Sequence, residues 1–283
     1  MRTMHLLNVN GQMLEVRLIQ VNEGNASKAS AAPLVFLHEG LGSVSAWTQR
    51  GLDWPLALCQ AAGRSGIVYS RQGYGQSCAA AQGRHQVPAD YLHTQAWTVL
   101  PALLAKLSAT KPILVGHSDG ASIALLYASR HPTVACIAMA PHVMVEAIAL
   151  DAIAEAKVAY ESGALKSALA KHHADVDGAF WQWNDVWLSP AFRSFDIREQ
   201  CRHITAPLLL IQGLDDAYGT MAQLDETALA APHAQQIRVA DCGHSPHRDQ
   251  PQITLSAIAS FLDEQLKLQG SMCYELSSCS RPY

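Results

Sequence analysis

The run Gly116-His117-Ser118-Asp119-Gly120 is the feature that most constrains how this chain folds. It follows the apolar stretch Ile113–Val115 and precedes Ala121–Ser129, in which apolar residues recur at helical spacing. We therefore expect a strand, a sharp turn and a helix in immediate succession, with Ser118 in the turn. Glycines at both ends of the run allow the strand and the helix to approach closely, and the turn exposes the serine hydroxyl.

A serine hydroxyl is a poor nucleophile without a base beside it, and the base in turn needs a group that orients it. The sequence supplies both after Ser118. Two carboxylates, Asp215 and Asp216, follow the apolar run Leu208–Ile211, and His244 stands in a polar segment after a later apolar run. The chain order serine, aspartate, histidine differs from that of other serine-enzyme folds. We predict Ser118 as nucleophile and His244 as base.

Apolar runs alternate with helical patterns along most of the chain. Continuous apolarity predicts strands that are covered on both faces, as in a parallel sheet between helices. The strands predicted in this way are Leu34–Leu37, Ile113–Val115 and Leu208–Ile211, each of which follows a proline. Further strands are predicted at Ile67–Tyr69, Ala135–Met139 and Gln236–Val239. The predicted helices include Tyr91–Leu107, Ala121–Ser129 and Ile253–Leu268. This alternation predicts the α/β class, with a doubly wound, mostly parallel sheet that binds ligands beyond the carboxyl ends of its strands.

Three segments depart from this alternation. Asn10-Gly11 lies between two semi-apolar runs and predicts an antiparallel hairpin at the start of the chain. Residues 146–201 are helical in period and contain Phe180, Trp181, Trp183 and Trp187. We interpret them as an inserted helical lid, and the alternative is that extra helices simply pack on the core. The core is then residues 1–145 and 202–268, and residues 269–283 form a loosely ordered tail.

Composition excludes several classes of protein. The hydrophobic fraction is 49%, yet no apolar run is long enough to cross a bilayer or to act as a secretory signal. The net charge is −4 without a dense basic stripe, so we expect no nucleic-acid partner and no membrane partner. The 7 scattered cysteines form no Cys-x-x-Cys pair, which favours a reducing, cytoplasmic location. A homo-oligomer is compatible with these features.

These motifs together resemble the α/β-hydrolase superfamily, and the resemblance spans nearly the whole chain up to the helix ending near Leu268. Members commonly carry the acid three positions after a glycine that ends a strand. Counted from Gly213, that position is Asp216, with Asp215 as its rival. The resemblance implies a Ser118, Asp216 and His244 triad that works without a cofactor or a metal.

The segment His38-Glu39-Gly40-Leu41-Gly42-Ser43 looks like the superfamily's oxyanion loop, usually His-Gly-x-x-Gly-Ser, with Glu39 in place of the first glycine. By that register the backbone N–H groups of Gly40 and Asp119 would bind the oxyanion. Ser70 to Ser77 resembles a second motif of the superfamily, which we interpret as a structural turn.

Four side chains are candidates for substrate binding: Glu39, Asp119, Trp181 and Trp183. A similar Ser-Asp-Gly elbow occurs in relatives resembling valacyclovir hydrolase, where the aspartate recognises an α-amino group. The alternative for Asp119 is that it caps the following helix. The alternative for the tryptophans is packing between lid helices. His172, His173, Asp175 and Asp177 match no common zinc motif, so we expect no metal.

The sequence thus predicts a serine hydrolase that cleaves a small-molecule acyl substrate, namely a carboxylic ester, a lactone or a thioester. Two alternatives stay open. The same triad also supports carbon–carbon bond hydrolysis or cofactor-free perhydrolysis in proteins of this resemblance. Some hydrolase-like proteins act instead as small-molecule receptors.

Overall fold

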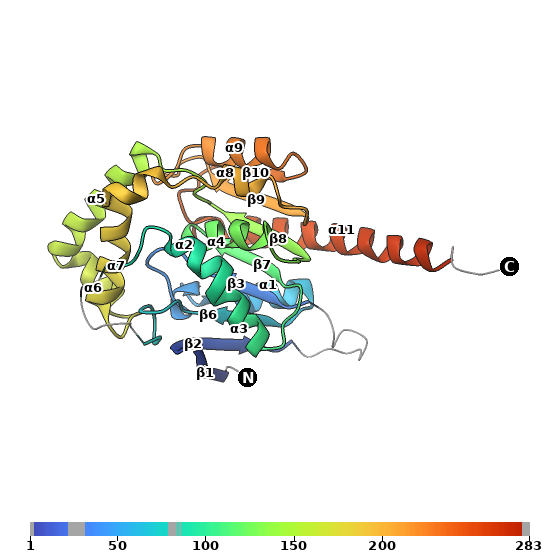
Figure 1. Ribbon diagram of the computed structural model, residues 1–283, viewed down its shortest axis with the longest axis horizontal. Coiled ribbons are helices and arrows are strands. Elements are labelled where there is room, and N and C mark those ends of the chain that lie inside the picture. The colour runs from blue at the N-terminus through green and yellow to red at the C-terminus, as the bar shows by residue number, and fades with distance from the viewer. Residues whose placement is uncertain (1–2, 22–31, 79–83, 85, 279–283) are drawn as a thin grey trace.

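A central sheet of eight strands organises the molecule, and five of its seven strand pairings are parallel. The computed structural model describes residues 3–21, 32–78, 84 and 86–278. The spatial order is β1-β2-β6-β3-β7-β8-β9-β10 (Figure 1). The strands are β1 (Thr3–Val9), β2 (Gln12–Ile19), β3 (Leu34–Leu37), β6 (Gly66–Tyr69), β7 (Ile113–His117), β8 (Ala135–Met139), β9 (Leu208–Gly213) and β10 (Gln235–Val239).

The central strands are buried on both faces because side chains alternate across a strand. In β3, Leu34 and Phe36 join the apolar cluster on one side of the sheet, whereas Val35 and Leu37 join the cluster on the other. This two-sided burial is why these strands read as continuous apolar runs. All six predicted strands are present, so the prediction of a mostly parallel α/β sheet is confirmed.

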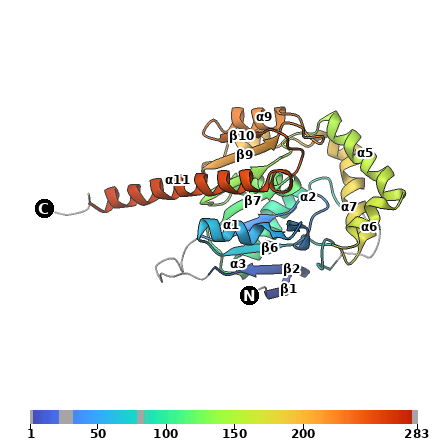
Figure 2. The same ribbon diagram turned by 180° about the vertical axis from the view of Figure 1, so that it is seen from behind.

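Helices cover both faces of the sheet. On one face lie α2 (Tyr91–Thr94), α3 (Leu100–Lys106) and α4 (Asp119–Ala128), whereas α1 (Trp54–Ala62) and α11 (Pro251–Ser278) lie together on the other (Figure 2). The remaining helices are α5 (Ala147–Glu161), α6 (Ala164–Leu169), α7 (Val176–Leu188), η4 (Pro190–Ser194), α8 (Arg198–Cys201), α9 (Ala222–Ala230) and α10 (Pro246–Asp249). Short elements also occur at η2 (Ser45–Trp47), β4 (Thr48–Gln49) and β5 (Leu52–Asp53).

The hairpin predicted at the start of the chain is confirmed. β1 and β2 pair antiparallel around Asn10 and Gly11, with φ values of 51° and 85°. Both residues adopt the left-handed conformation that a two-residue hairpin turn requires.

The predicted helix Tyr91–Leu107 is not uniform. A π-helical segment, Gln95–Val99, separates α2 from α3. Pro101 stands in the first turn of α3 and has no N–H to donate to the preceding turn, which is a physical reason for the irregular hydrogen bonding there.

The helices α5, α6 and α7 gather at one end of the sheet, between β8 and β9 in sequence (Figure 1). They fall within residues 146–201, for which the sequence predicts a lid. At the other end α11 continues to Ser278 and extends away from the sheet, so it is longer than the helix predicted to end near Leu268. Of the predicted tail, residues 269–278 thus have a helical backbone, and residues 279–283 lie outside the described residues.

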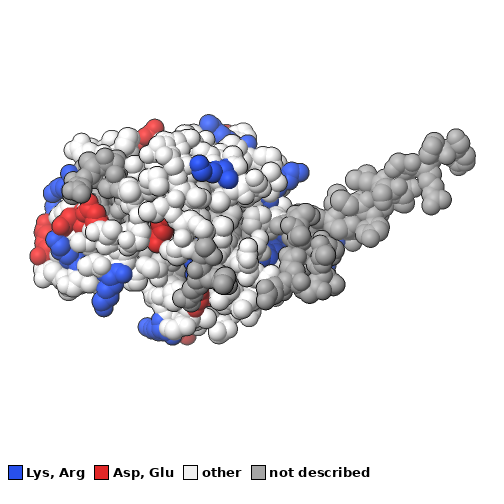
Figure 3. All heavy atoms as spheres, turned by 90° about the horizontal axis from the view of Figure 1, so that it is seen from below, with Lys and Arg blue, Asp and Glu red and all other residues white. Residues whose placement is uncertain are grey.

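The surface seen in Figure 3 carries basic side chains scattered among acidic and uncharged ones. Across the residues that the structure describes, no helix combines the length and the apolar character needed to span a bilayer. The expectations about nucleic acid, oligomeric state and a cytoplasmic location stay predictions from the sequence.

Candidate active site

Ser118 lies in a strained turn between β7 and α4. Its backbone has φ 53° and ψ −120°, a conformation that costs a non-glycine residue on the order of 1–3 kcal/mol. The close approach of strand and helix explains the flanking glycines: a Cβ atom on Gly120 would lie 2.0 Å from the carbonyl oxygen of Leu37. A Cβ atom on Gly116 would lie 2.3 Å from the carbonyl oxygen of Gly120.

Three side chains from separate loops meet at this turn. Nε2 of His244 lies 2.9 Å from Oγ of Ser118, and Nδ1 of His244 lies 2.9 Å from both carboxylate oxygens of Asp216. The three residues follow β7, β9 and β10, whose carboxyl ends share one edge of the sheet. The structure therefore brings together the three residues that the sequence predicts as a triad.

Asp216 is placed to accept a hydrogen bond from the imidazole. Its side chain also accepts from the backbone N–H of Tyr218 at 2.8 Å and from Nε2 of Gln212 at 3.1 Å. Burial disfavours the carboxylate, but the hydrogen bond and the charge of His244 outweigh that effect and lower the pKa of Asp216. Asp215, the rival in sequence, is exposed.

The predicted oxyanion groups border the same cavity as Ser118. Asp119 is the first residue of α4, so its N–H is among those that a helix leaves without an intrahelical acceptor. Gly40 lies in the loop after β3, directly under the indole of Trp183, where a Cβ atom would meet Nε1 at 2.2 Å. Both residues line the cavity.

The Asp119 carboxylate is held by partners from three other elements. It accepts hydrogen bonds from the hydroxyl of Tyr91 at 2.6 Å and from Nε1 of Trp187 at 3.2 Å, and Nη2 of Arg71 lies 3.6 Å away. Burial raises the pKa of Asp119, while Arg71 and the two donors act in the opposite direction. Asp119 stands in the first turn of α4, where a negative charge is favourable, but the hydrogen bonds described for its carboxylate come from Tyr91 and Trp187 and not from N–H groups of the helix.

Arg71 belongs to the turn that the sequence analysis interpreted as structural. Its guanidinium donates to the carbonyl oxygens of His38 at 2.6 Å and Glu39 at 3.0 Å. It therefore links the predicted oxyanion loop to Asp119 at the start of α4.

A cavity of about 350 Å³ opens onto Ser118. Its apolar wall comes mainly from the predicted lid and comprises Ile153, Leu165, Ala168, Leu169, Trp183 and Trp187. The opposite wall is polar and includes Glu39, Gln49, His172 and Arg248. Trp181 is not among the described residues that line the cavity, because it packs against Tyr160 and Phe180 with its ring under the guanidinium of Arg84.

His142 also borders the cavity, and sequence reasoning missed it. It follows β8, and its ring lies 5.5 Å from that of His244. The hydroxyl of Ser122 donates a hydrogen bond to the backbone carbonyl of His142 and accepts one from its backbone N–H. Burial lowers the pKa of His142 to about 3, so its imidazole is neutral near pH 7. Its place after the strand next to β7 was the available signal, since ligands bind beyond the carboxyl ends of such strands.

The lid histidines and aspartates have separate partners. His172 pairs with Ser45 at 2.9 Å, and His173 bridges the backbone of Gly75 and Leu41, each at 3.0 Å. Asp175 caps α7, and Asp177 pairs with Lys166 at 2.8 Å.

Comparison with known proteins places this geometry in a family. The family model described as "Alpha/beta hydrolase family" matches residues 34–257. The chain is 25% identical over 265 residues to 2-(acetamidomethylene)succinate hydrolase of Mesorhizobium japonicum, covering 84% of this chain and 91% of that protein. It is 24% identical over 263 residues to the sn-1-specific diacylglycerol lipase ABHD11 of Mus musculus, covering 83% and 82%.

Solved structures show the same fold. The enol-lactonase from Burkholderia xenovorans LB400 superposes with a TM-score of 0.67 at 20% identity, covering 91% of this chain and 99% of that one. The family match spans most of the chain and includes the Ser118 turn, Asp216 and His244. This protein is a hydrolase that belongs to the alpha/beta hydrolase family.

Proposed function

We propose that this protein is a serine hydrolase that cleaves a small carboxylic ester, lactone or thioester through an acyl-enzyme on Ser118. The observation that carries the proposal is the row of hydrogen-bonding distances from Ser118 through His244 to Asp216, each 2.9 Å. A nucleophile, a base and an orienting carboxylate at these separations are what acyl transfer by serine requires.

In this mechanism His244 takes the proton of Ser118 as Oγ attacks the substrate carbonyl carbon. The N–H groups of Gly40 and Asp119 stabilise the oxyanion, and Asp216 stabilises the imidazolium. His244 then protonates the leaving alcohol or thiol, and the acyl group stays on Ser118. A water molecule, deprotonated by His244, releases the carboxylic acid and restores the serine.

The cavity supports a small acyl substrate. Its volume of about 350 Å³ is at the lower end of the range for small-molecule sites, and the lid supplies an apolar wall. The relatives named as a lipase and as an enol-lactonase are consistent with ester and lactone substrates for this chain. Trp183 lines that wall, and we propose that it contacts the substrate.

Labelling with a fluorophosphonate followed by peptide mapping tests the proposal. We expect one modified residue, Ser118, and no modification in a Ser118→Ala variant. A matched control is Ser194→Ala, which removes an exposed serine at the end of η4 and should label like the wild type. Modification at another residue, or none in the folded wild-type protein, contradicts the proposal.

A substrate panel separates the alternative activities. Chromogenic esters, lactones and thioesters should turn over repeatedly, whereas dienone-type substrates report carbon–carbon bond hydrolysis. A single turnover with tight retention of the product would instead indicate a receptor.

A further inference from the structure

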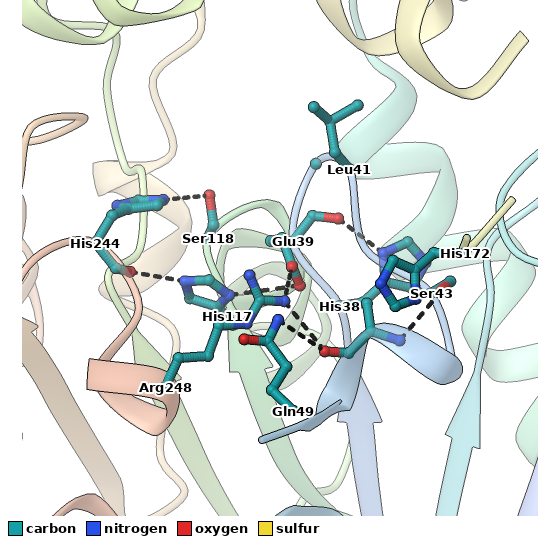
Figure 4. A network of polar contacts seen from close by, with 12 residues as sticks. His38, Glu39, Leu41, Ser43, Gln49, His117, Ser118, His172, His244 and Arg248 are labelled. Carbon is teal, nitrogen blue, oxygen red and sulfur yellow. Dashed lines mark hydrogen bonds and ion pairs between the residues drawn. The ribbon is translucent and has the colours of Figure 1, made fainter. Parts of the chain in front are cut away.

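Glu39 occupies an unusual place for a carboxylate, because it follows β3 in the predicted oxyanion loop. Its side chain is 14% exposed, and both oxygens face groups of the protein (Figure 4). Oε1 accepts a hydrogen bond from Nη2 of Arg248, and Oε2 lies 3.5 Å from Nδ1 of His117. The carboxylate is therefore engaged within the protein even though it borders the cavity.

His117 lies between this carboxylate and the loop that carries the predicted base. It is the last residue of β7, and its Nε2 lies 2.7 Å from the carbonyl oxygen of His244. A carbonyl oxygen only accepts, so Nε2 must carry the hydrogen. Nδ1 is buried, has no hydrogen-bond partner among the residues that the structure describes, and points toward Glu39 (Figure 4). Burial lowers the pKa of His117, which favours the neutral ring, so Nδ1 presents a lone pair rather than a hydrogen to the Glu39 carboxylate.

Arg248 connects the segment after His244 to the loop that carries Glu39. It lies in α10, four residues after His244, and also donates to the carbonyl oxygen of Ala46 at 3.4 Å. Asp216 pairs with His244, and Asp119 pairs with Arg71. Among the described contacts, Glu39 is therefore the carboxylate that pairs with Arg248. Burial works against the Glu39 carboxylate, yet the charge of Arg248 helps to hold the pKa of Glu39 well below its usual range.

We propose that Glu39 is a positioning residue: through its ion pair with Arg248 it fixes the loop that carries His244 against the predicted oxyanion loop. This inference rests on the proposed hydrolysis, in which His244 and the N–H of Gly40 act on opposite sides of one carbonyl group. A glycine at position 39 could not make this ion pair. Small displacements of a catalytic group cost up to about 100-fold in rate, so such a connection affects turnover.

The test uses Glu39→Gln, which keeps the size of the side chain and removes its charge, and Arg248→Met. For turnover of a p-nitrophenyl ester we expect kcat to fall about 10- to 100-fold and KM to change less than about 3-fold. The double variant should lose no more than the worse single variant, because both changes break one connection. Glu226→Gln is the matched control, since Glu226 also pairs with an arginine, Arg198 at 2.9 Å, but on the surface.

A raised KM with an unchanged kcat in Glu39→Gln would show that Glu39 binds substrate and would overturn the inference. The inference would also be overturned if the kcat losses of the two single variants multiplied in the double variant. A second readout needs no turnover: the downfield proton NMR signal of the hydrogen between His244 and Asp216. We expect it to shift or broaden in Glu39→Gln and to stay unchanged in Glu226→Gln. An unchanged signal in Glu39→Gln refutes the inference, whereas an inactive, unlabelled wild type refutes only the proposed hydrolysis.

Discussion

Replacing Asp119 by asparagine should destabilise the protein rather than alter its choice of substrate. Asp119 and Arg71 are 1% and 2% exposed, and Arg71 is also fixed to the predicted oxyanion loop. An asparagine still accepts from Nε1 of Trp187 and can bond the Tyr91 hydroxyl, but it leaves the buried guanidinium without its counter-charge.

The expected cost follows from that unpaired charge. Removing one partner of a buried ion pair costs about 3–5 kcal/mol, and the retained hydrogen bonds place Asp119→Asn near the lower limit. At roughly 2 °C per kcal/mol for a chain of this size, Tm should fall by about 6 °C. The matched control is Asp177→Asn, which breaks a half-exposed pair with Lys166 and should cost less than about 1 kcal/mol.

Calorimetry at pH 7.5 measures both variants, and hydrolysis of alanyl and acetyl esters of one alcohol measures specificity. We expect the two esters to lose activity by the same factor in Asp119→Asn. The reasoning fails if Asp119→Asn has the same Tm as the wild type. A loss confined to the alanyl ester would show instead that Asp119 binds an α-amino group, as the Ser-Asp-Gly motif alone suggested.

Three further predictions test other parts of the site. Asp216→Asn should lower kcat by about 10⁴-fold while Asp215→Asn leaves it unchanged, and equal effects would contradict the assignment. The pKa of His142 is about 3 when folded and near 6.5 when unfolded, so unfolding takes up a proton as pH falls through that window. Between pH 7 and pH 5 the wild type should therefore lose about 2 kcal/mol more unfolding free energy than His142→Gln, measured by urea titration. Gly40→Ala should lower kcat because its Cβ atom meets Trp183, and Trp183→Ala in the same chain should restore part of it.

The sequence predicted those site residues that lie just after the carboxyl ends of strands. Apolar runs identified the parallel strands β3, β6, β7, β8 and β9, whereas β10 has the mixed sequence Gln-Gln-Ile-Arg-Val. The polar residues after β7, β9 and β10 became Ser118, Asp216 and His244. Parallel strands bring their carboxyl ends to one edge, so residues in such loops meet without any knowledge of loop conformation. The choice of Asp216 over Asp215 depended on the resemblance to the superfamily, because periodicity alone does not distinguish these two neighbours.

Side-chain partners from distant segments could not be predicted in this way. Glu39 and Arg248 are separated by 209 positions, and no periodic pattern links them. Tyr91 and Trp187 reach Asp119 from 28 and 68 positions away. Such pairs depend on rotamers and on how helices pack, which a single sequence specifies only through the complete fold. His142 escaped notice for a related reason, since a lone histidine carries no motif.

These pairings change what selects the substrate in the proposed reaction. From the sequence, Glu39 and Asp119 make the site look acidic, which would favour a cationic substrate. In the structure Glu39 faces the half-buried guanidinium of Arg248, and Asp119 faces the buried guanidinium of Arg71. An incoming cation would have to compete with an arginine that is already in place and would leave that arginine unpaired, at a cost of several kcal/mol. Discrimination between substrates then falls to the shape of the apolar wall, where a single methylene changes binding by only about 1–3 kcal/mol. We therefore expect a family of neutral acyl groups of similar size to be accepted, ranked by how well they fill the space beneath Trp183.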